Sequence, residues 1–175
     1  DRVGLGHARL SIIDPESGAQ PIHNEDETLW IVYNGEVFNY VELRAELECH
    51  GHHFYTGTDT EVVLHLYEQE GPECLDRLNG QFAFAVWDRR KRELFLARDR
   101  VGIMPLHYTM AGGMLIFASE VKAIFAAPAV PRSMDPCSID QIFTFWTVLP
   151  GNTVFSGVRE VLPGHYLRVS KGELL

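Results

Sequence analysis

Residues 82–87 form the run Phe82-Ala83-Phe84-Ala85-Val86-Trp87, in which large and small apolar side chains alternate and no polar side chain occurs. Successive side chains of a strand point to opposite faces of its sheet, so a strand over this run is apolar on both faces. Both faces then have to be covered by other layers of the fold. The run therefore predicts the interior strand of a layered sheet structure.

Further strands are predicted on both sides of this run. They are apolar or β-branched stretches bounded by turn residues, and they cover residues 10–13, 28–33, 93–98, 106–108, 114–118 and 166–169. The basic run Arg89-Arg90-Lys91-Arg92 falls in an expected hairpin turn. Asn34-Gly35 is expected to end the strand over residues 28–33, and the last strand is expected to form a hairpin with residues near Val154.

Helices are predicted from capping residues and from apolar positions at helical spacing, over residues 39–51, 59–71, 119–125 and 138–146. Asp59 or Thr60 is the expected N-cap of the second helix, and Gly71-Pro72 is expected to end it. A pair of helices followed mainly by strands is typical of the α+β class, with sheet packed on sheet.

The composition fits a globular protein of 175 residues with a net charge of −9. Nucleic acid is not an expected partner, because binding to it relies on clustered Lys and Arg. Membrane insertion is not expected either, because no apolar stretch reaches the ~20 residues of a membrane span. Cys49, Cys74 and Cys137 show no disulfide or metal-binding pattern, which favours a reducing compartment and predicts a cytoplasmic protein.

The common catalytic motifs GxSxG, P-loop, HExxH and CxxC are absent from the sequence. The nearest group of potential metal ligands is Cys49-His50-Gly51-His52-His53, at the expected end of a helix. No partner group occurs elsewhere in the sequence, so a solvated helix end is favoured and no metal is expected. Whether His50, His52 and His53 bind a metal stays open to titration with zinc or nickel.

Six segments in order along the chain carry a more specific signal. They read GHARLSIID over residues 6–14, NGEVFN over 34–39, TGTDTE over 56–61, GQFAF over 80–84, RDRVGIMPL over 98–106 and SEVKA over 119–123. Together they resemble the class II glutamine amidotransferase domain of the glutamine-hydrolysing asparagine synthetases. One segment alone would be weak evidence, whereas six in register are specific.

The resemblance implies the fold of the N-terminal-nucleophile (Ntn) hydrolases, a four-layer αββα sandwich of two antiparallel sheets. It implies an amidotransferase core over residues 1–127, and a linker helix and hairpin over 128–175 that lead toward a synthetase domain. The implied reaction hydrolyses the amide of L-glutamine to glutamate and ammonia, for ATP-dependent amidation of aspartate or a related carboxylate. ATP and Mg²⁺ are expected in the chain's own C-terminal synthetase domain, and no cofactor is expected within residues 1–175.

The resemblance also implies a role for individual residues. Arg9 is expected to bind the α-carboxylate of glutamine, for which a guanidinium has the right geometry, and Asp59 is expected to bind the α-ammonium. Asn34 and Gly35 are the expected catalytic residues, as donors of an oxyanion hole, and Glu36 follows them in the pocket. The backbone along the same pocket is expected to come from Leu10, Ser11, Ile12 and Ile13.

Taken one at a time, the same residues have simpler interpretations. Asn34-Gly35 is a strong hairpin-turn signal, Asp59 is typical of a helix N-cap, and an Arg9 in a strand is usually exposed or ion-paired. Arg98 and Asp99 are expected to shape a loop rather than to take part in chemistry. The functional interpretation therefore depends on the joint match.

The chain departs from the family at Asp1, where relatives carry a cysteine nucleophile whose own α-amine serves as the base. Cys49, Cys74 and Cys137 lie mid-chain and are expected to be incidental. We therefore expect an inactive fragment without its first strand region, and a homo-oligomer formed through the exposed sheet edge. The alternatives are a non-catalytic binding or scaffold module and the amidotransferase domain of a different biosynthetic enzyme.

Overall fold

The computed structural model describes residues 3–8 and 18–175, and it contains two antiparallel sheets. The larger sheet has the strand order β1-β2-β3-β4-β8-β9, and the smaller sheet has the order β6-β5-β7. The larger sheet consists of β1 (Ile22–His23), β2 (Leu29–Val37), β3 (Gly80–Asp88), β4 (Glu93–Arg98), β8 (Tyr166–Ser170) and β9 (Glu173–Leu174). The smaller sheet consists of β5 (His107–Ala111), β6 (Met114–Ala118) and β7 (Arg159–Glu160).

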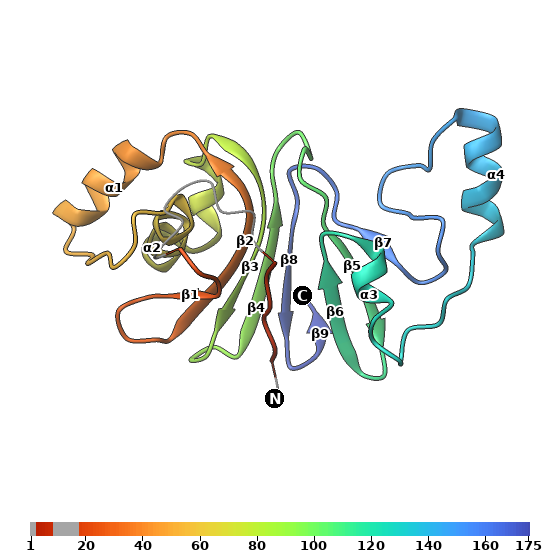
Figure 1. The fold of residues 1–175 in the computed structure, drawn as a ribbon, viewed down its shortest axis with the longest axis horizontal. Helices are drawn as coiled ribbons and strands as arrows, with labels where there is room; N and C mark the ends of the chain where they lie inside the picture. Colours follow the sequence, from red (N-terminus) through yellow and green to blue (C-terminus); the bar gives the residue numbers. More distant parts are fainter. Residues whose placement is uncertain (1–2, 9–17) are drawn as a thin grey trace.

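The described residues also form helices. They are α1 (Tyr40–Cys49), α2 (Asp59–Glu70), the 3-10 helix η1 (Gly71–Asp76), α3 (Val121–Ile124) and α4 (Pro136–Phe145). Figure 1 shows α1 and α2 on the outer side of the larger sheet, and α3 beside the smaller sheet. This arrangement confirms the predicted α+β sandwich of two antiparallel sheets.

Strand β3 is buried on both faces, as its sequence predicts. Phe82, Phe84 and Val86 belong to the core between the larger sheet and α1 and α2. Ala83 and Ala85 belong to the core between the two sheets. Small side chains therefore face the other sheet and large side chains face the helices, which lets both layers pack closely on one strand.

The N-cap of α2 is Thr58, whose side-chain oxygen accepts a hydrogen bond from the N–H of Glu61. The prediction of Asp59 or Thr60 was wrong by one or two positions, because the carboxylate of Asp59 binds β2 instead. The end of α2 at Gly71 is confirmed, with a φ of +64° at that glycine. The structure buries the apolar residues Val62, Val63, Leu66 and Tyr67 of this helix.

One predicted strand end and one predicted strand pairing were wrong. Strand β2 does not stop at Asn34-Gly35 but runs on to Val37, fully paired with β3. Strand β8 pairs with β4 and with β9, and not with residues near Val154. The division of the chain at residue 127 stays a prediction, although β8 lies within the larger sheet. The strand expected over residues 10–13 lies outside the described residues.

Helix α4 stands away from the two sheets (Figure 1). Its apolar side chains are largely uncovered, with Phe143 82% exposed and the following Trp146 91% exposed. In the part of the chain that the structure describes, no helix is long and apolar enough to cross a membrane.

Candidate functional site

Asn34 and Gly35 lie inside β2, opposite Ala83 and Phe82 of β3. Gly35 has a φ of +149°, and a Cβ on it would lie 2.1 Å from the carbonyl oxygen of Gln81. Only glycine allows the two backbones to approach this closely. This glycine therefore serves strand packing and not a hairpin turn.

The edge of β2 that faces away from β3 carries several bound backbone groups. The side chain of Gln20 donates to the carbonyl of Tyr33 at 3.0 Å and accepts from its N–H at 2.6 Å. The N–H of Val37 donates to Oδ2 of Asp59 at 3.0 Å. Alternate residues of a strand direct their backbone groups to the same edge, so the N–H of Gly35 points to this edge between those two contacts.

Asp59 is the buried first residue of α2. Its Oδ2 accepts a second hydrogen bond, from the hydroxyl of Tyr33 at 2.9 Å. Burial raises the pKa of Tyr33, and the neighbouring carboxylate raises it further, so this hydroxyl remains a donor. Asp59 thus fixes the start of α2 to β2 on both sides of Asn34-Gly35.

A cavity of about 490 Å³ lies between the two sheets. Asn34 of β2, Ala83 of β3 and Phe117 of β6 line it, together with residues 6–8. Among the described residues, neither Glu36 nor Asp59 lines this cavity: Glu36 is exposed, and Asp59 reaches β2 from α2. Asp59 therefore binds the strand that contains Asn34, but it does not line the cavity that Asn34 lines.

The predicted residues Arg9, Leu10, Ser11, Ile12 and Ile13 lie outside the described part of the chain. Residues on both sides of them lie beside β2: Ala8 lines the cavity with Asn34, and Gln20 binds the backbone of Tyr33.

Arg98 and Asp99 organise the loop between β4 and β5, as the sequence predicts. Asp99 accepts hydrogen bonds of 2.6–3.3 Å from the backbone N–H groups of Phe82, Val101, Gly102, Ile103 and Met104. Burial alone would raise the pKa of Asp99, but these N–H donors outweigh it and hold the pKa below its usual value. The guanidinium of Arg98 donates to the carbonyls of Gly102, Met104 and Val161 and to the carboxylate of Glu160.

The run from Cys49 to His53 does not form one group of ligands. Cys49 is the exposed last residue of α1, and His50 is its C-cap. The Nδ1 atom of His53 lies 2.9 Å from the carbonyl oxygen of Gly51. His52 turns toward the acidic side chains of Glu25 and Glu68.

A family model described as a glutamine amidotransferase domain matches residues 1–175. The chain belongs to the glutamine amidotransferase family. Glutamine-hydrolysing asparagine synthetase 3 of Bacillus subtilis is 44% identical over 98% of this chain and 28% of that protein. The amidase chyE of Penicillium rubens is 40% identical over 94% of this chain and 24% of that protein.

Solved structures agree with the fold of this amidotransferase domain. The glutamine phosphoribosylpyrophosphate amidotransferase of B. subtilis, complexed with ADP and GMP, aligns with a TM-score of 0.63 and 26% identity. The alignment covers 89% of this chain and 30% of that one. The predicted resemblance and the Ntn-hydrolase-like fold are therefore confirmed. The chain spans 23–28% of the length of the three B. subtilis synthetases that it matches.

The cysteines of this amidotransferase domain do not lie in the cavity. Cys74 is fully buried, and burial raises the pKa of its thiol to about 12, which disfavours the nucleophilic thiolate. Cys49 and Cys137 are exposed residues of α1 and α4.

Sequence reasoning missed two residues that build the site, Tyr33 and Gln20. Tyr33 binds Asp59, which is 26 residues away, and Gln20 binds the backbone of Tyr33, which is 13 residues away. Neither contact follows a helix or strand period, so no local signal in the sequence could have indicated it.

Proposed function

We propose that this chain is the glutaminase domain of an asparagine-synthetase-like enzyme and that it binds L-glutamine beside β2. The observation that carries the proposal is the anchoring of Asp59 to β2 on both sides of Asn34-Gly35. Recognition of L-glutamine needs an anion for the α-ammonium group and hydrogen-bond donors for the oxygen of the side-chain amide. The anchored carboxylate of α2 and the Asn34-Gly35 segment of β2 are proposed to supply both.

The proposed oxyanion hole consists of the side-chain amide of Asn34 and the backbone N–H of Gly35. The backbone N–H of Gly35 is fixed before substrate binds, because β2 is paired with β3 along its whole length. Fixed donors stabilise the negative oxygen of a tetrahedral intermediate without having to reorganise. Glu36 follows in the same strand as a further residue of the proposed pocket.

Arg9 is the proposed partner of the substrate's α-carboxylate. Its sequence neighbour Ala8 lines the cavity that Asn34 also lines, which supports a position of Arg9 within reach of the substrate. The backbone of Leu10, Ser11, Ile12 and Ile13 completes the proposed pocket.

The attacking thiol, in this proposal, belongs to a cysteine that precedes Asp1 in the full-length protein. The pKa of about 12 argues against Cys74, and the positions of Cys49 and Cys137 on α1 and α4 argue against those two thiols. The 175-residue chain is therefore expected to bind glutamine without hydrolysing it.

The proposed partner is a synthetase domain of the same full-length protein, which is proposed to be cytoplasmic. In that domain, ATP and Mg²⁺ are proposed to serve the amidation of aspartate or a related carboxylate by the released ammonia. The B. subtilis relatives are about four times as long as this chain, which leaves room for such a domain. The uncovered apolar face of α4, with Phe143 and Trp146, supports a surface that another domain covers.

Calorimetry with L-glutamine tests the binding proposal directly. The 175-residue chain is expected to bind, and Arg9→Ala and Asp59→Ala are expected to abolish binding while the exposed control Asp140→Ala retains it. Unchanged affinity in the two site variants would overturn these assignments.

Glutamate release from glutamine tests the activity, with the full-length protein beside the 175-residue chain. Glutamate release by the full-length protein but not by the 175-residue chain supports the proposal. No release from a folded full-length protein would favour a scaffold module, and release by the short chain would mean that its nucleophile lies within residues 1–175. Comparison of aspartate with other carboxylates as acceptors would separate an asparagine synthetase from a different biosynthetic enzyme.

A further inference from the structure

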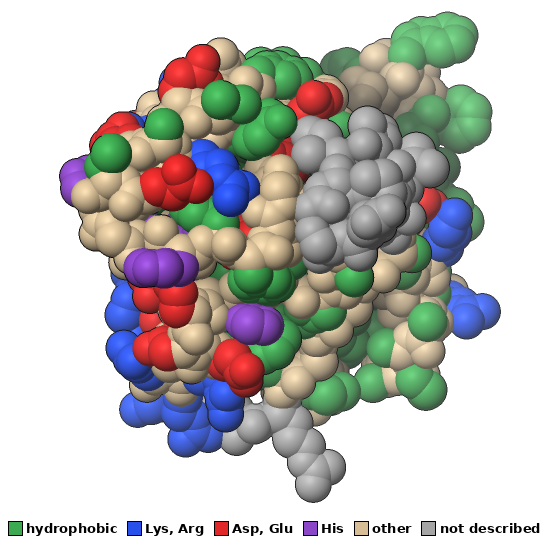
Figure 2. Space-filling model, turned by 60° about the vertical axis from the view of Figure 1, so that its left-hand side comes forward, with side chains coloured by type: hydrophobic (Ala, Val, Ile, Leu, Met, Phe, Trp, Pro, Cys, Tyr) green, Lys and Arg blue, Asp and Glu red, His purple; other side chains and the backbone are tan. Residues whose placement is uncertain are grey.

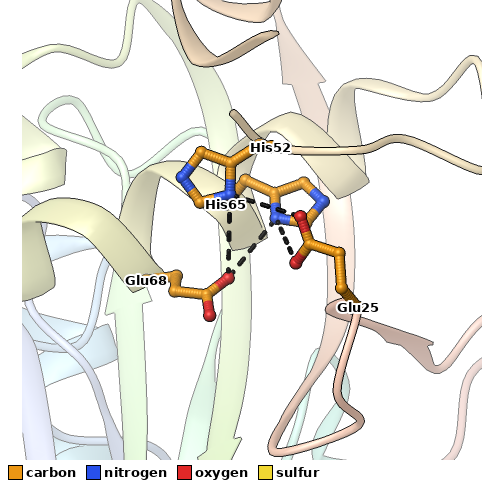
Figure 3. Close-up of side chains that lie close together, drawn as sticks. All are labelled: Glu25, His52, His65 and Glu68. Carbon is orange, nitrogen blue, oxygen red and sulfur yellow. Dashed lines mark hydrogen bonds and ion pairs between the residues drawn. The ribbon is translucent and has the colours of Figure 1, made fainter. Parts of the chain in front are cut away.

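Two histidines and two glutamates meet where α2 packs against two connecting segments. Glu25 lies between β1 and β2, His52 lies between α1 and α2, and His65 and Glu68 lie on α2. Figure 3 shows the four side chains pointing toward one another from these separate segments. We call Glu25, His52, His65 and Glu68 the His-Glu cluster.

The donor atoms of the His-Glu cluster are spaced like the ligands of a small cation. Nδ1 of His65 lies 3.4 Å from Oε2 of Glu68 and 3.5 Å from Oε2 of Glu25. Nδ1 of His52 lies 3.5 Å from Oε1 of Glu25 and 3.9 Å from Oε2 of Glu68. Zinc binds such atoms tetrahedrally at about 2.0–2.2 Å, which separates neighbouring ligands by about 3.4 Å. The four distances are close to this value, although Glu25 contributes a different oxygen to each histidine. With one ligand atom from each residue, the four atoms all lie within 4.8 Å of one another.

Neighbouring groups hold both carboxylates in place. Oε1 of Glu68 accepts a hydrogen bond from Nδ2 of Asn24 at 2.8 Å, which leaves Oε2 facing the cluster. Oε1 of Glu25 accepts one from the backbone N–H of His53 at 2.9 Å. Ligands of metal sites are commonly oriented by hydrogen bonds of this kind from outside the site.

His65 is fully buried, with its two ring nitrogens facing different groups. Nδ1 faces the cluster, and Nε2 lies 3.6 Å from Oε1 of the fully buried Glu61. That distance is longer than a hydrogen bond, and Nε2 has no hydrogen-bond partner among the described residues. A metal-binding histidine typically directs its second nitrogen toward a carboxylate, which is the arrangement found here.

Three carboxylates surround the buried ring of His65. Oε2 of Glu68, Oε2 of Glu25 and Oε1 of Glu61 lie 3.4, 3.5 and 3.6 Å from its nitrogens. A divalent cation at the centre of the cluster would offset this negative charge. On the surface that Figure 2 shows, histidine and acidic side chains likewise lie next to one another.

We propose that Glu25, His52, His65 and Glu68 bind one divalent transition-metal ion, and that Zn²⁺ is the ion that these donors fit. Two imidazoles with two carboxylates suit zinc-like metals, whereas Mg²⁺ and Ca²⁺ prefer oxygen ligands alone. The ion fastens the β1–β2 loop and the α1–α2 connection to α2, the helix that begins with Asp59. The inference is independent of the proposed function, because none of the four residues belongs to the proposed glutamine site.

The test uses the 175-residue chain without a polyhistidine tag, stripped of metal by a chelator and titrated with Zn²⁺ in a calorimeter. We expect one ion per chain, and we expect His52→Ala and Glu68→Gln to weaken binding by at least about 100-fold. His52 is preferred to the buried His65 for substitution, because its loss leaves a smaller hole in the core. The matched controls are His50→Ala and His53→Ala, which change neighbouring histidines outside the cluster and are expected to leave the affinity unchanged.

Substitution with Co²⁺ gives a second readout, since its visible spectrum reports coordination geometry. A strong tetrahedral spectrum that disappears in His52→Ala supports the proposal. Failure of Zn²⁺ to bind the folded wild-type chain would overturn it. Binding that is lost in His50→Ala or His53→Ala but kept in His52→Ala would also overturn it, because the ion would then occupy the surface run from Cys49 to His53.

Discussion

The hydroxyl of Tyr33 donates a hydrogen bond to Oδ2 of Asp59 at 2.9 Å, although the two residues are 26 positions apart in the sequence. Together with the N–H of Val37, it fixes the first turn of α2 against β2. The carboxylate proposed to bind the substrate's ammonium is therefore held by the strand that carries Asn34 and Gly35.

Replacement of Tyr33 by Phe removes one of these two donors and leaves a buried carboxylate short of a partner. The free energy of unfolding is expected to fall by about 1–3 kcal/mol, and the affinity for glutamine is expected to fall with it. Urea unfolding and calorimetry measure the two effects. Tyr108→Phe is the control, since Tyr108 makes no hydrogen bond through its hydroxyl to the described residues and should lose little stability. Equal losses in the two variants would contradict the prediction.

Replacement of Asn34 by Ala removes a proposed oxyanion donor. In the full-length protein, kcat for glutamate release is expected to fall about 100- to 1000-fold, with a much smaller change in KM. The reason is that the donor acts on charge that develops only in the transition state. Steady-state kinetics checks this, with Asn152→Ala, an exposed asparagine, as the control. An unchanged kcat would remove Asn34 from the proposed mechanism.

Replacement of Gly35 by Ala places a Cβ 2.1 Å from the backbone of Gln81, so β2 and β3 have to separate. Gly113→Ala is a matched control, because Gly113 also has a positive φ, of +73°, but has nothing within 4 Å of the added Cβ. We expect Gly113→Ala to cost about 1–2 kcal/mol from backbone strain alone. Gly35→Ala should cost clearly more, or prevent folding, as measured by chemical denaturation. A similar cost in both variants would show that the close approach is unimportant.

The lowered pKa of Asp99 makes stability depend on pH. Because this pKa is lower in the folded than in the unfolded chain, the carboxylate stabilises the fold at pH values above its unfolded pKa. That contribution is lost as the pH falls through the folded value. Asp99→Asn should therefore lower stability at neutral pH by about 1–3 kcal/mol and should flatten the loss of stability between roughly pH 5 and pH 2. Unfolding curves across this range test the prediction, and the exposed Asp140→Asn should retain the wild-type pH dependence.

The sequence was sufficient to predict those elements whose pattern is local. The alternating run at residues 82–87 indicated a strand buried on both faces, and β3 is such a strand. The end of α2 at Gly71 follows from the conformational freedom of glycine and was also predicted correctly.

The errors arose where a distant partner decides the conformation. Asn34-Gly35 looks like a turn when read alone, but the backbone of Gln81 requires a glycine inside β2. The N-cap of α2 shifted to Thr58 because Asp59 is bound by Tyr33. The His-Glu cluster was missed because its members come from three segments, although His65 and Glu68 stand at the i, i+3 spacing that places them on one helix face.

The position of β8 has a consequence for how the chain can acquire its structure during synthesis. The side chain of Arg168 in β8 binds that of Glu93 in β4, 75 residues earlier. Until the ribosome has released this late strand, β4 remains an open edge with free backbone groups, which other growing chains can pair with. Pairing across so long a loop is also slow, so the larger sheet is expected to close as one of the last steps of folding.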